Sequence, residues 1–205
     1  MSAALERPRI VVASGNPGKA REIARILDHY DVTSLAELPS IEFPEEGGDY
    51  FENARVKASV AARATGCLCV ADDSGLEVDA LNGAPGPFSA RFGGVGLDDR
   101  GRLEALLTAL DEVPEPRAAR FFCVAAVASP NGQSEIAEGS CLGTILRQAR
   151  GEGGFGYDPI FQPAGEERVM AELDREEKDA LSHRGRAFRA LEPAIKKFWL
   201  GEDAG

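Results

Sequence analysis

The sequence feature that constrains the fold most is the apolar run 67–71, which leads directly into two acids, Asp72 and Asp73. A short apolar run of this kind is typical of a buried strand. Ser74 and Gly75 follow, and we expect the strand to end there. Carboxylates at the carboxyl end of a buried strand lie where α/β sheets bind their ligands. The stretch therefore predicts a sheet-based fold with a ligand site at this point.

The rest of the chain alternates between apolar and polar segments that predict further strands and helices. Strands are expected at 9–13, 120–129 and 135–146, and helices at 19–30, 50–64, around 103–110 and in the C-terminal tail. The turn at 130–132 favours a hairpin between the last two strands, and Pro193 should kink or divide the last helix. This order predicts an α/β fold with a mixed central sheet flanked by helices.

Neither a repeat nor a linker divides the sequence, so we expect one domain over residues 1–205, with flexible ends at 1–8 and 201–205. The net charge of −11 argues against a nucleic-acid polymer or an anionic membrane as partner, because both select basic surfaces. No apolar run approaches the roughly 20 residues that span a bilayer, and the first residues lack the apolar core of a signal peptide. We therefore expect a cytoplasmic protein.

A glycine-containing turn between the first strand and the first helix is a candidate anion site. It comprises Ser14, Gly15, Asn16, Pro17, Gly18 and Lys19. Backbone N–H groups at a helix start, together with one lysine, can bind a phosphate. The turn is not a Walker A loop, because its glycines are too close and Ala20 replaces the magnesium-binding Ser or Thr. A plain strand-to-helix turn with a solvated Lys19 is the alternative.

The paired acids are candidates for metal binding and catalysis. Adjacent strand residues point to opposite faces, so Asp72 and Asp73 should have different roles, one bracing the backbone and the other meeting a metal or water. Mg²⁺ prefers one or two carboxylates, with phosphates and waters completing its shell. A pair of acids that merely caps a turn is the alternative. In the helix at 50–64, Asn53 and Lys57 share a face, although their spacing alone favours a solvated surface.

Two later motifs combine groups suited to a planar, oxygen-bearing ligand. Phe155 and Tyr157 lie among glycines, so that stacking surfaces and close backbone approach coincide, and Asp158 can accept hydrogen bonds from ring N–H groups. A turn with its aromatics in the core is equally compatible. His183 and Arg184, after the expected N-cap Ser182, can donate hydrogen bonds to carbonyl oxygens of a base.

Together these motifs resemble one family. They are Ser-x-Asn-x-x-Lys at 14–19, Glu-x-Gly with Glu-Asn-Ala-x-x-Lys-Ala within 45–58, Ala-Asp-Asp-Ser-Gly-Leu at 71–76, Gly-Ala-Pro-Gly with Ser-Ala-Arg within 83–91, Gly-Gly-Phe-Gly-Tyr-Asp-Pro-x-Phe at 153–161 and Ser-His-Arg-Gly at 182–185. From about Arg9 to Leu200 the chain resembles the XTP/dITP diphosphatases, also called inosine triphosphate pyrophosphatases. The resemblance implies a homodimeric α/β protein with two lobes around a substrate cleft. It also implies hydrolysis of the non-canonical purine triphosphates XTP, ITP and dITP to monophosphate and pyrophosphate.

The resemblance also implies roles for individual residues. The triphosphate would lie on Ser14, Gly15, Asn16, Pro17, Gly18 and Lys19, with Lys57 and Lys178 adding positive charge. Asp73 would activate water and bind Mg²⁺ together with Glu45, and Ser74 would contact the substrate. The base would be held by Phe155, Gly156, Tyr157 and Asp158, and its oxygen edge would be recognised by His183 and Arg184. Asp49-Tyr50 stands where the family pattern leads us to expect Thr-Phe. Whether Glu45 or the adjacent Glu46 faces the metal therefore stays open, with the spacing favouring Glu45.

These roles suit phosphoanhydride hydrolysis, which needs neutralised phosphate charge and an aligned water. Donors such as His183 and Arg184 favour a 6-oxo group over the 6-amino group of adenine. Guanine also carries a 6-oxo group, so a further contact near C2 must reject its amino group, and no motif identifies that contact. Two other functions remain open. One is a pyrophosphatase for modified pyrimidines or methylated bases, and the other is a regulatory module that binds a triphosphate without cleaving it.

Overall fold

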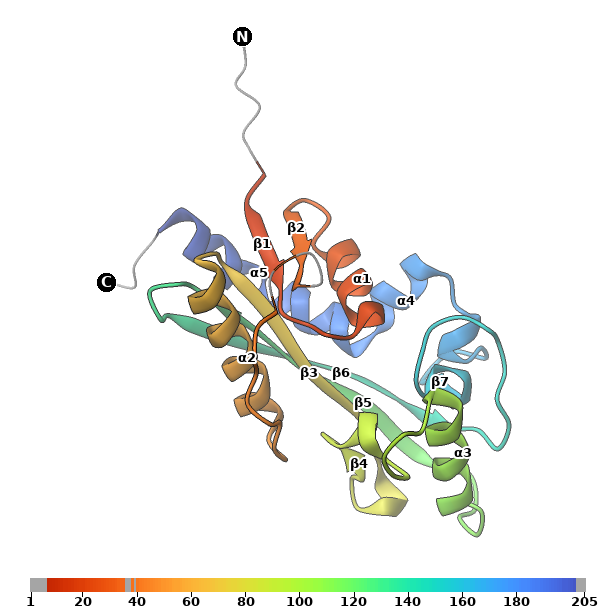
Figure 1. Cartoon of the computed structure of the whole chain (residues 1–205). Coiled ribbons are helices and arrows are strands. Elements are labelled where there is room, and N and C mark those ends of the chain that lie inside the picture. Colours follow the sequence, from red (N-terminus) through yellow and green to blue (C-terminus); the bar gives the residue numbers. More distant parts are fainter. Residues whose placement is uncertain (1–6, 36–37, 39, 202–205) are drawn as a thin grey trace.

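The computed structural model describes residues 7–35, 38 and 40–201, and it has the predicted mixed α/β architecture (Figure 1). The strands are β1 (Arg9–Val12), β2 (Asp31–Ser34), β3 (Cys69–Val78), β4 (Pro85–Gly86), β5 (Ala118–Ala128), β6 (Ser134–Ile145) and β7 (Phe161–Pro163). The α-helices are α1 (Pro17–Ile26), α2 (Tyr50–Thr65), α3 (Asp99–Ala109), α4 (Arg175–Leu181) and α5 (His183–Leu200). Short 3₁₀ turns are η2 (Asp79–Leu81), η3 (Ser89–Arg91), η4 (Asp158–Ile160) and η5 (Met170–Glu172). The predicted flexible ends, 1–8 and 201–205, fall mostly outside the described residues.

One sheet runs through the described part of the chain in the order β2-β1-β3-β5-β6-β7, with β4 beside β3. β1 is parallel to β2 and β3, whereas β3, β5, β6 and β7 pair antiparallel. β5 and β6 form the predicted hairpin. Figure 1 shows helix α2 on one face of the long strands and α1 with α5 on the other. β1 pairs with β3 only through Cys69 and Val70, so the chain leaves β1 close to the paired acids.

Side chains of β3 alternate between the two faces of the sheet, as the pleat requires. Ala71 packs in the cluster beneath α2, and Val70 packs in the cluster beneath α1 and α5. Further along that second face, Leu76 belongs to a separate apolar cluster that includes α3 residues. Asp72 and Ser74 share this face and lie between the two clusters, so polar side chains replace the core there.

The expectation that Gly75 ends the strand is wrong. β3 continues to Val78, because its pairing with β5 is unbroken from Cys69 onward. The glycine is needed for a different reason, since a Cβ at this position would collide with the carbonyl oxygen of Gly86 in β4 and lie 2.6 Å from the Tyr50 hydroxyl. Gly75 therefore lets another strand and a helix side chain approach the backbone closely.

The last helix is not divided at Pro193 either, because α5 runs continuously from His183 to Leu200. Apolar residues on both sides of the proline, including Leu191 and Ile195, are buried against β5 and α1. Packing of this face stabilises the helix across a residue that cannot donate a backbone hydrogen bond.

Candidate active site

Asp72 and Asp73 are both buried, but they face opposite sides of the sheet. The Oδ2 atom of Asp72 accepts hydrogen bonds from Arg184 Nε at 3.2 Å, Arg184 Nη2 at 3.1 Å and Ser74 Oγ at 3.0 Å. Lys19 Nζ lies 3.1 Å from the same atom. Burial alone would raise the pKa of Asp72, but Lys19 and Arg184 together hold it below its usual range. Asp72 is thus a permanently charged anchor.

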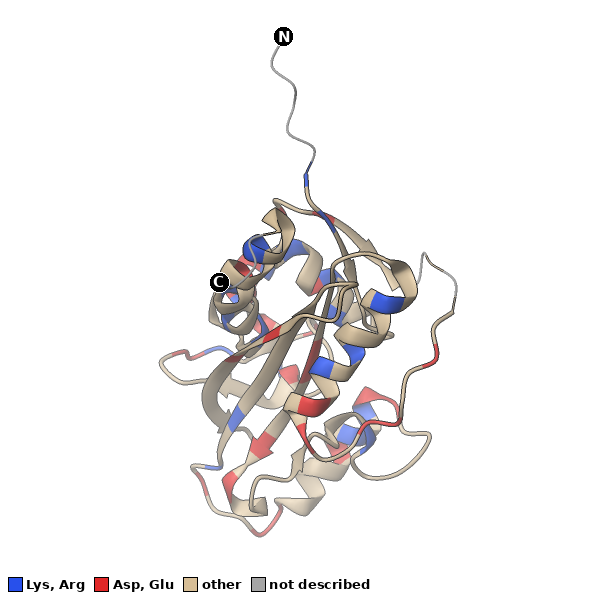
Figure 2. Cartoon of the chain, turned by 90° about the vertical axis from the view of Figure 1, so that its left-hand side faces the viewer, with Lys and Arg blue, Asp and Glu red and all other residues tan. Residues whose placement is uncertain are grey.

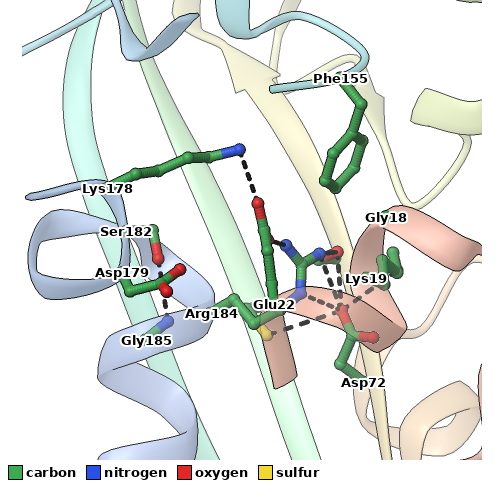
Figure 3. Close-up of polar contacts among 12 residues, drawn as sticks. Gly18, Lys19, Glu22, Asp72, Phe155, Lys178, Asp179, Ser182, Arg184 and Gly185 are labelled. Atoms are coloured by element: carbon green, nitrogen blue, oxygen red, sulfur yellow. Dashed lines mark hydrogen bonds and ion pairs between the residues drawn. The ribbon is translucent and has the colours of Figure 1, made fainter. Parts of the chain in front are cut away.

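A chain of alternating charges continues from Arg184 toward the glycine-aromatic loop (Figure 3). Arg184 Nη1 is hydrogen-bonded to Glu22 of α1, and the other carboxylate oxygen of Glu22 lies 2.6 Å from Lys178 Nζ. Lys178 Nζ in turn lies 2.6 Å from Asp158 Oδ2 and 4.8 Å from the centre of the Phe155 ring. Each buried charge in this chain is therefore compensated by an opposite one.

The sequence reasoning did not find Glu22, which is 5% exposed and central to this network. Burial would raise its pKa, but Arg184 and Lys178 lower it overall, so Glu22 is ionised. The sequence feature that could have identified Glu22 is its position three residues after Lys19, which places both side chains on one face of α1. An acid next to the apolar Ile23 looks like an ordinary helix residue until its partners, more than 150 positions away, are known.

On the opposite face, Asp73 is surrounded by weaker interactions. Its Oδ2 accepts a hydrogen bond from Asn53 Nδ2 at 2.8 Å, and its Oδ1 accepts one from the Ser74 backbone N–H at 3.1 Å. Lys57 Nζ is 3.7 Å from Oδ1, because it donates instead to Glu46 Oε1 and to the Asp72 carbonyl, both at 2.7 Å. Burial raises the pKa of Asp73 overall, although Lys57 and Asn53 oppose the rise. Asp73 is therefore the more basic of the two acids.

A hollow of about 410 Å³ lies between the acidic loop and α2, next to Asp73's partners. Its lining includes Glu45, Glu46, Asn53 and Lys57. The Glu46 side chain is held by Lys57, whereas that of Glu45 is 92% exposed and has Arg91 at 4.0 Å as its cationic neighbour. Glu45 is the carboxylate with oxygens still available.

The donors at this hollow fit a magnesium site shared with substrate. Within the described ranges, no group of three or more His, Cys, Asp and Glu side chains is arranged to hold a metal by itself. Mg²⁺ does not need such a cage, because one or two carboxylates suffice when phosphates and waters complete its shell. Asp73 and Glu46 already converge on one cation, the Lys57 ammonium, which shows that the site attracts positive charge. Asp73 and Glu45 can therefore hold the metal.

The turn before α1 lies over Asp72, but its backbone is partly occupied. Asn16 caps the helix, its Oδ1 accepting from the N–H groups of Gly18 at 2.8 Å and Lys19 at 3.2 Å. These two N–H groups, predicted as anion ligands, are hydrogen-bonded within the turn. A Cβ on Gly18 would lie 2.9 Å from Phe155 Cδ1, so this glycine lets the turn contact the glycine-aromatic loop. Ser14 and the Lys19 ammonium remain at the surface of the turn.

The glycine-aromatic loop is held by hydrogen bonds to its own side chains and to η3. Asp158 Oδ2 accepts from the Phe155 N–H at 2.8 Å, and burial raises the pKa of Asp158 although Lys178 opposes the rise. Gly154 has a φ of +72°, and a Cβ there would collide with the Asp158 carboxylate. Tyr157 is buried and donates its hydroxyl to the Ser89 carbonyl at 2.9 Å. Phe155, which is half-buried and lines the neighbouring cavity, therefore remains the candidate stacking surface of the loop.

A cavity of about 220 Å³ lies between this loop, β3 and the N-terminus of α5. Its lining includes Asn16, Lys19, Ser74, Gly75, Leu76, Ser89, Ala90, Asp99, Arg102, Phe121, Phe155, Gly156, Tyr157, Asp158, Lys178, His183 and Arg184. The His183 ring stacks on Phe121 with centroids 4.8 Å apart, and its Nδ1 has no hydrogen-bond partner in the part of the chain that is described. Burial, with Arg184 adding to it, lowers the pKa of His183 well below its ordinary value, so the ring is neutral.

The match to a family model decides what kind of chain this is. The model described as the Ham1 family matches residues 10–194. The chain belongs to the Ham1 family. A dITP/XTP pyrophosphatase of Bacillus cereus is 50% identical over 200 residues, covering 95% of this chain and 98% of that protein. One of Streptomyces coelicolor is 47% identical over 195 residues, covering 92% and 98%.

Solved Ham1 structures share the fold. A HAM1 protein from Coxiella burnetii matches with a TM-score of 0.81 at 39% identity, over 93% of this chain and 99% of that one. The Ham1 protein of Staphylococcus aureus matches with a TM-score of 0.80 at 39% identity, over 92% and 98%. The family membership expected from the motifs is therefore confirmed, and so is the α/β class.

In this Ham1-family chain, most of the predicted site residues converge, but in two groups. Asn16, Lys19, Ser74, the 155–158 loop, Lys178, His183 and Arg184 line the 220 Å³ cavity. Glu45 and Lys57 line the hollow beneath α2 instead, and Asp73 lies between the two groups. Gly15, Pro17 and Gly18 belong to the turn but are not among the cavity residues.

The contacts of Lys178 and Arg184 differ from the roles predicted for them. Lys178 lies beside Phe155 between two carboxylates, and Arg184 is committed to Asp72, Glu22 and Ser74. Sequence reasoning also missed α3, which contributes Asp99 and Arg102 to the cavity. Nothing in the amphipathic pattern at 103–110 distinguished this helix from an ordinary surface helix.

Basic and acidic residues are interspersed along the ribbon rather than gathered in one basic stripe (Figure 2). Among the described residues, none of the helices has the length and apolar character required to span a membrane.

Proposed function

We propose that this chain is a dITP/XTP pyrophosphatase that hydrolyses XTP, ITP and dITP to the monophosphate and pyrophosphate. The observation that carries the proposal is a base-sized cavity lined by Asn16 and Lys19 of a helix-start turn and by Ser74, the residue after Asp73, which is the more basic carboxylate of the buried acid pair. The names of relatives that are 47–50% identical over nearly the whole chain support the same activity.

The substrate would lie along the cavity with its triphosphate near the turn before α1. Lys19 and Lys57 reach the two faces of β3 and would neutralise phosphate charge from either side. The base would stack on Phe155, the half-buried aromatic of the loop that lines the cavity. Lys178, next to that ring, then serves the base end of the substrate, and we assign it there rather than to the phosphates.

Asp73 would act as the general base. Because burial raises its pKa, its carboxylate takes a proton more readily than an ordinary aspartate does. It would remove a proton from a water that attacks the α-phosphorus, forming a P–O bond while the bond to the departing pyrophosphate breaks. Asn53 holds the second carboxylate oxygen and so fixes the orientation of the base. Asp72, whose Oδ2 is held by Lys19 and Arg184, stays ionised and anchors the structure.

Mg²⁺ held by Asp73 and Glu45 would supply charge neutralisation on the phosphates. Glu46 would instead position Lys57, since it already accepts a 2.7 Å hydrogen bond from that ammonium. Lys57, in turn, is kept in place by the Asp72 carbonyl. Glu45 would thus bind the metal, whereas Glu46 would bind Lys57.

Selectivity for a 6-oxo purine would come from donors at the end of the cavity where α5 begins. Neutral His183 offers one ring N–H, and Lys178 offers an ammonium directed toward the cavity. An adenine amino group would oppose the Lys178 ammonium, which has donors and no acceptor. Arg184 would support the site through Asp72 and Glu22 and bring its positive charge to within 5.7 Å of the Phe155 ring centre.

A homodimer in the cytoplasm completes the proposal. Leu142 on β6 and Trp199 on α5 are 61% and 47% exposed, large apolar surfaces that a second copy would cover. Sedimentation analysis at several protein concentrations tests the dimer, and cell fractionation tests the compartment.

Pyrophosphate release with Mg²⁺ from ITP, XTP and dITP, compared with ATP, GTP and dTTP, tests the function. Fast release from the first three alone supports it. Release mainly from dTTP or from modified bases would show a different substrate class on the same fold. Intact ITP bound without cleavage would indicate a binding module.

A further inference from the structure

Arg102 of α3 is the cationic side chain of the cavity to which no motif and no step of the proposed chemistry assigns a role. It lines the cavity and is 23% exposed. Its Nη1 lies 3.1 Å from Asp99 Oδ1, and its Nε is buried without a hydrogen-bond partner among the residues described. A guanidinium carries five N–H donors and no acceptor. Arg102 therefore brings unused donors to the substrate cavity.

Arg102 lies at the end of the cavity formed by α3, beside the apolar cluster of Leu76 and Leu103. Ser74 and Leu76 follow one another on the same face of β3, Ser74 beside Asp72 and its partner Lys19, Leu76 in the α3 cluster. Leu103, the neighbour of Arg102, packs in that same cluster together with Tyr157. A nucleotide with its phosphates at the turn would direct its base toward this end.

The purine position that distinguishes the relevant bases there is C2. Xanthine carries a 2-oxo group, which accepts hydrogen bonds, guanine carries a 2-amino group, which donates them, and hypoxanthine carries only hydrogen. An arginine at this edge meets an acceptor in xanthine, nothing in hypoxanthine and a competing donor in guanine. We propose that Arg102 is a specificity-determining residue that reads C2, favouring XTP and rejecting GTP; the inference rests on the proposed function.

Asp99 would position Arg102 relative to the stacking surface. One carboxylate oxygen of Asp99 contacts the arginine, and the other accepts the Gly156 N–H at 2.9 Å. Gly156 directly follows Phe155, on which the base would stack. The Asp99 carboxylate therefore links the guanidinium to the loop that carries Phe155, and it would hold the donor at the level of the stacked base.

The test compares kcat/KM for XTP, ITP and GTP in wild type and in Arg102→Met, which keeps an unbranched side chain of similar helix propensity and removes the guanidinium. We expect the XTP/ITP ratio to fall about tenfold and the GTP/ITP ratio to rise about fivefold, because the variant lacks the donor that distinguishes the bases. Arg100→Met is the matched control, since Arg100 is 86% exposed and pairs with Glu104 on the same helix. Its ratios should equal those of wild type.

Arg102→Lys keeps the charge, and an intermediate XTP/ITP ratio in this variant would support recognition by a donor. Unchanged ratios in Arg102→Met, or an equal loss for all three substrates, would overturn the proposal while leaving the wild-type activity intact. A wild type that cleaves neither XTP nor ITP would instead overturn the proposed function and this inference with it. The melting temperatures of both variants identify a loss that comes from misfolding.

Discussion

Asp72 and Asp73 are neighbours in β3 and equally buried, yet their surroundings shift their pKa values in opposite directions. Asp72 meets two cationic side chains and a hydroxyl on one oxygen, and its pKa lies below the usual range. Asp73 meets an amide and a backbone N–H, with an ammonium at 3.7 Å, and burial raises its pKa. The strand pleat alone separates them. One residue step therefore divides a structural anchor from a candidate base.

The difference shows how this sheet provides both stability and reactivity. On the face of Asp72, buried charges alternate in sign from Lys19 to Asp158, and each has a partner. On the face of Asp73, the partial pairing leaves a carboxylate near the hollow that fits a metal. Substitutions on the first face should cost stability, whereas those on the second should cost turnover.

The largest effect is expected for Asp73→Asn, which removes the base but keeps its shape. We expect kcat for ITP to fall about 10³-fold, because an amide cannot accept the proton from water. Unfolding free energy should stay within about 1 kcal/mol of wild type, since the ion pair of Asp73 with Lys57 is long, at 3.7 Å, and Lys57 keeps its contacts with Glu46 and the Asp72 carbonyl. Pyrophosphate release and urea unfolding measure the two quantities. Turnover retained within tenfold would place the base elsewhere.

Asp72→Asn should have the opposite profile and provides the matched comparison. Removing its charge leaves Lys19 and Arg184 with less compensation in a buried site, and we expect a loss of about 3 kcal/mol in unfolding free energy. Urea unfolding measured beside Asp73→Asn checks this. Equal losses in the two variants would mean that the faces do not differ as their contacts indicate.

A smaller effect should separate the two acids of the 45–46 pair. Glu45→Gln should raise the Mg²⁺ concentration for half-maximal rate about tenfold, because it removes a free metal-binding carboxylate. Glu46→Gln should change that concentration less and raise the KM for ITP, because Lys57 loses its partner. Mg²⁺ titrations of both variants distinguish the acids. The reverse ranking would assign the metal to Glu46.

The smallest effect is the pH dependence of unfolding free energy, which tests whether water is excluded from the face of the sheet that carries Asp72. Burial lowers the pKa of His183, so below about pH 6.5 the unfolded chain binds a proton that the folded chain does not. Unfolding free energy should thus fall as pH drops from 6.5, with a His183 contribution of at most about 1.4 kcal/mol per pH unit. Urea unfolding at pH 5, 6 and 7 measures it.

His183→Gln should make unfolding free energy depend less on pH. His29→Gln is the control, because His29 is exposed in the turn that follows α1. A slope that survives in His183→Gln would assign the linked proton to another group.

Much of the fold and of the site followed from local pattern. The apolar runs predicted β1, β3, β5 and β6, although not the short β2, β4 and β7, and the helix predicted at 50–64 is α2, which ends at the left-handed Gly66. Ser182 caps α5 through the Gly185 N–H at 3.0 Å. Asn53 and Lys57 share a helix face as their spacing predicts, although that spacing favoured a solvated surface and both side chains instead reach Asp73. Such features depend on residues within a few positions of one another, and sequence carries them directly.

What the pattern could not predict depends on distant partners. Gly75 appeared to end a strand, whereas its role is the approach of Gly86 and Tyr50. Pro193 appeared to break a helix that packing holds together. Arg184 appeared free to bind a base until Glu22 and Asp72, both more than 100 residues earlier, became its partners.

The sequence by itself determined the family, the order of the elements and the residue types at the site, because motifs and periodicity are local properties of the chain. Only the tertiary structure decided which carboxylate is held by two cations and which is the candidate base, and that α3 reaches the cavity with Asp99 and Arg102. The physical reason is that charge compensation and desolvation depend on what surrounds a group in space. Adjacent residues of a strand have different surroundings because the pleat directs them to opposite faces.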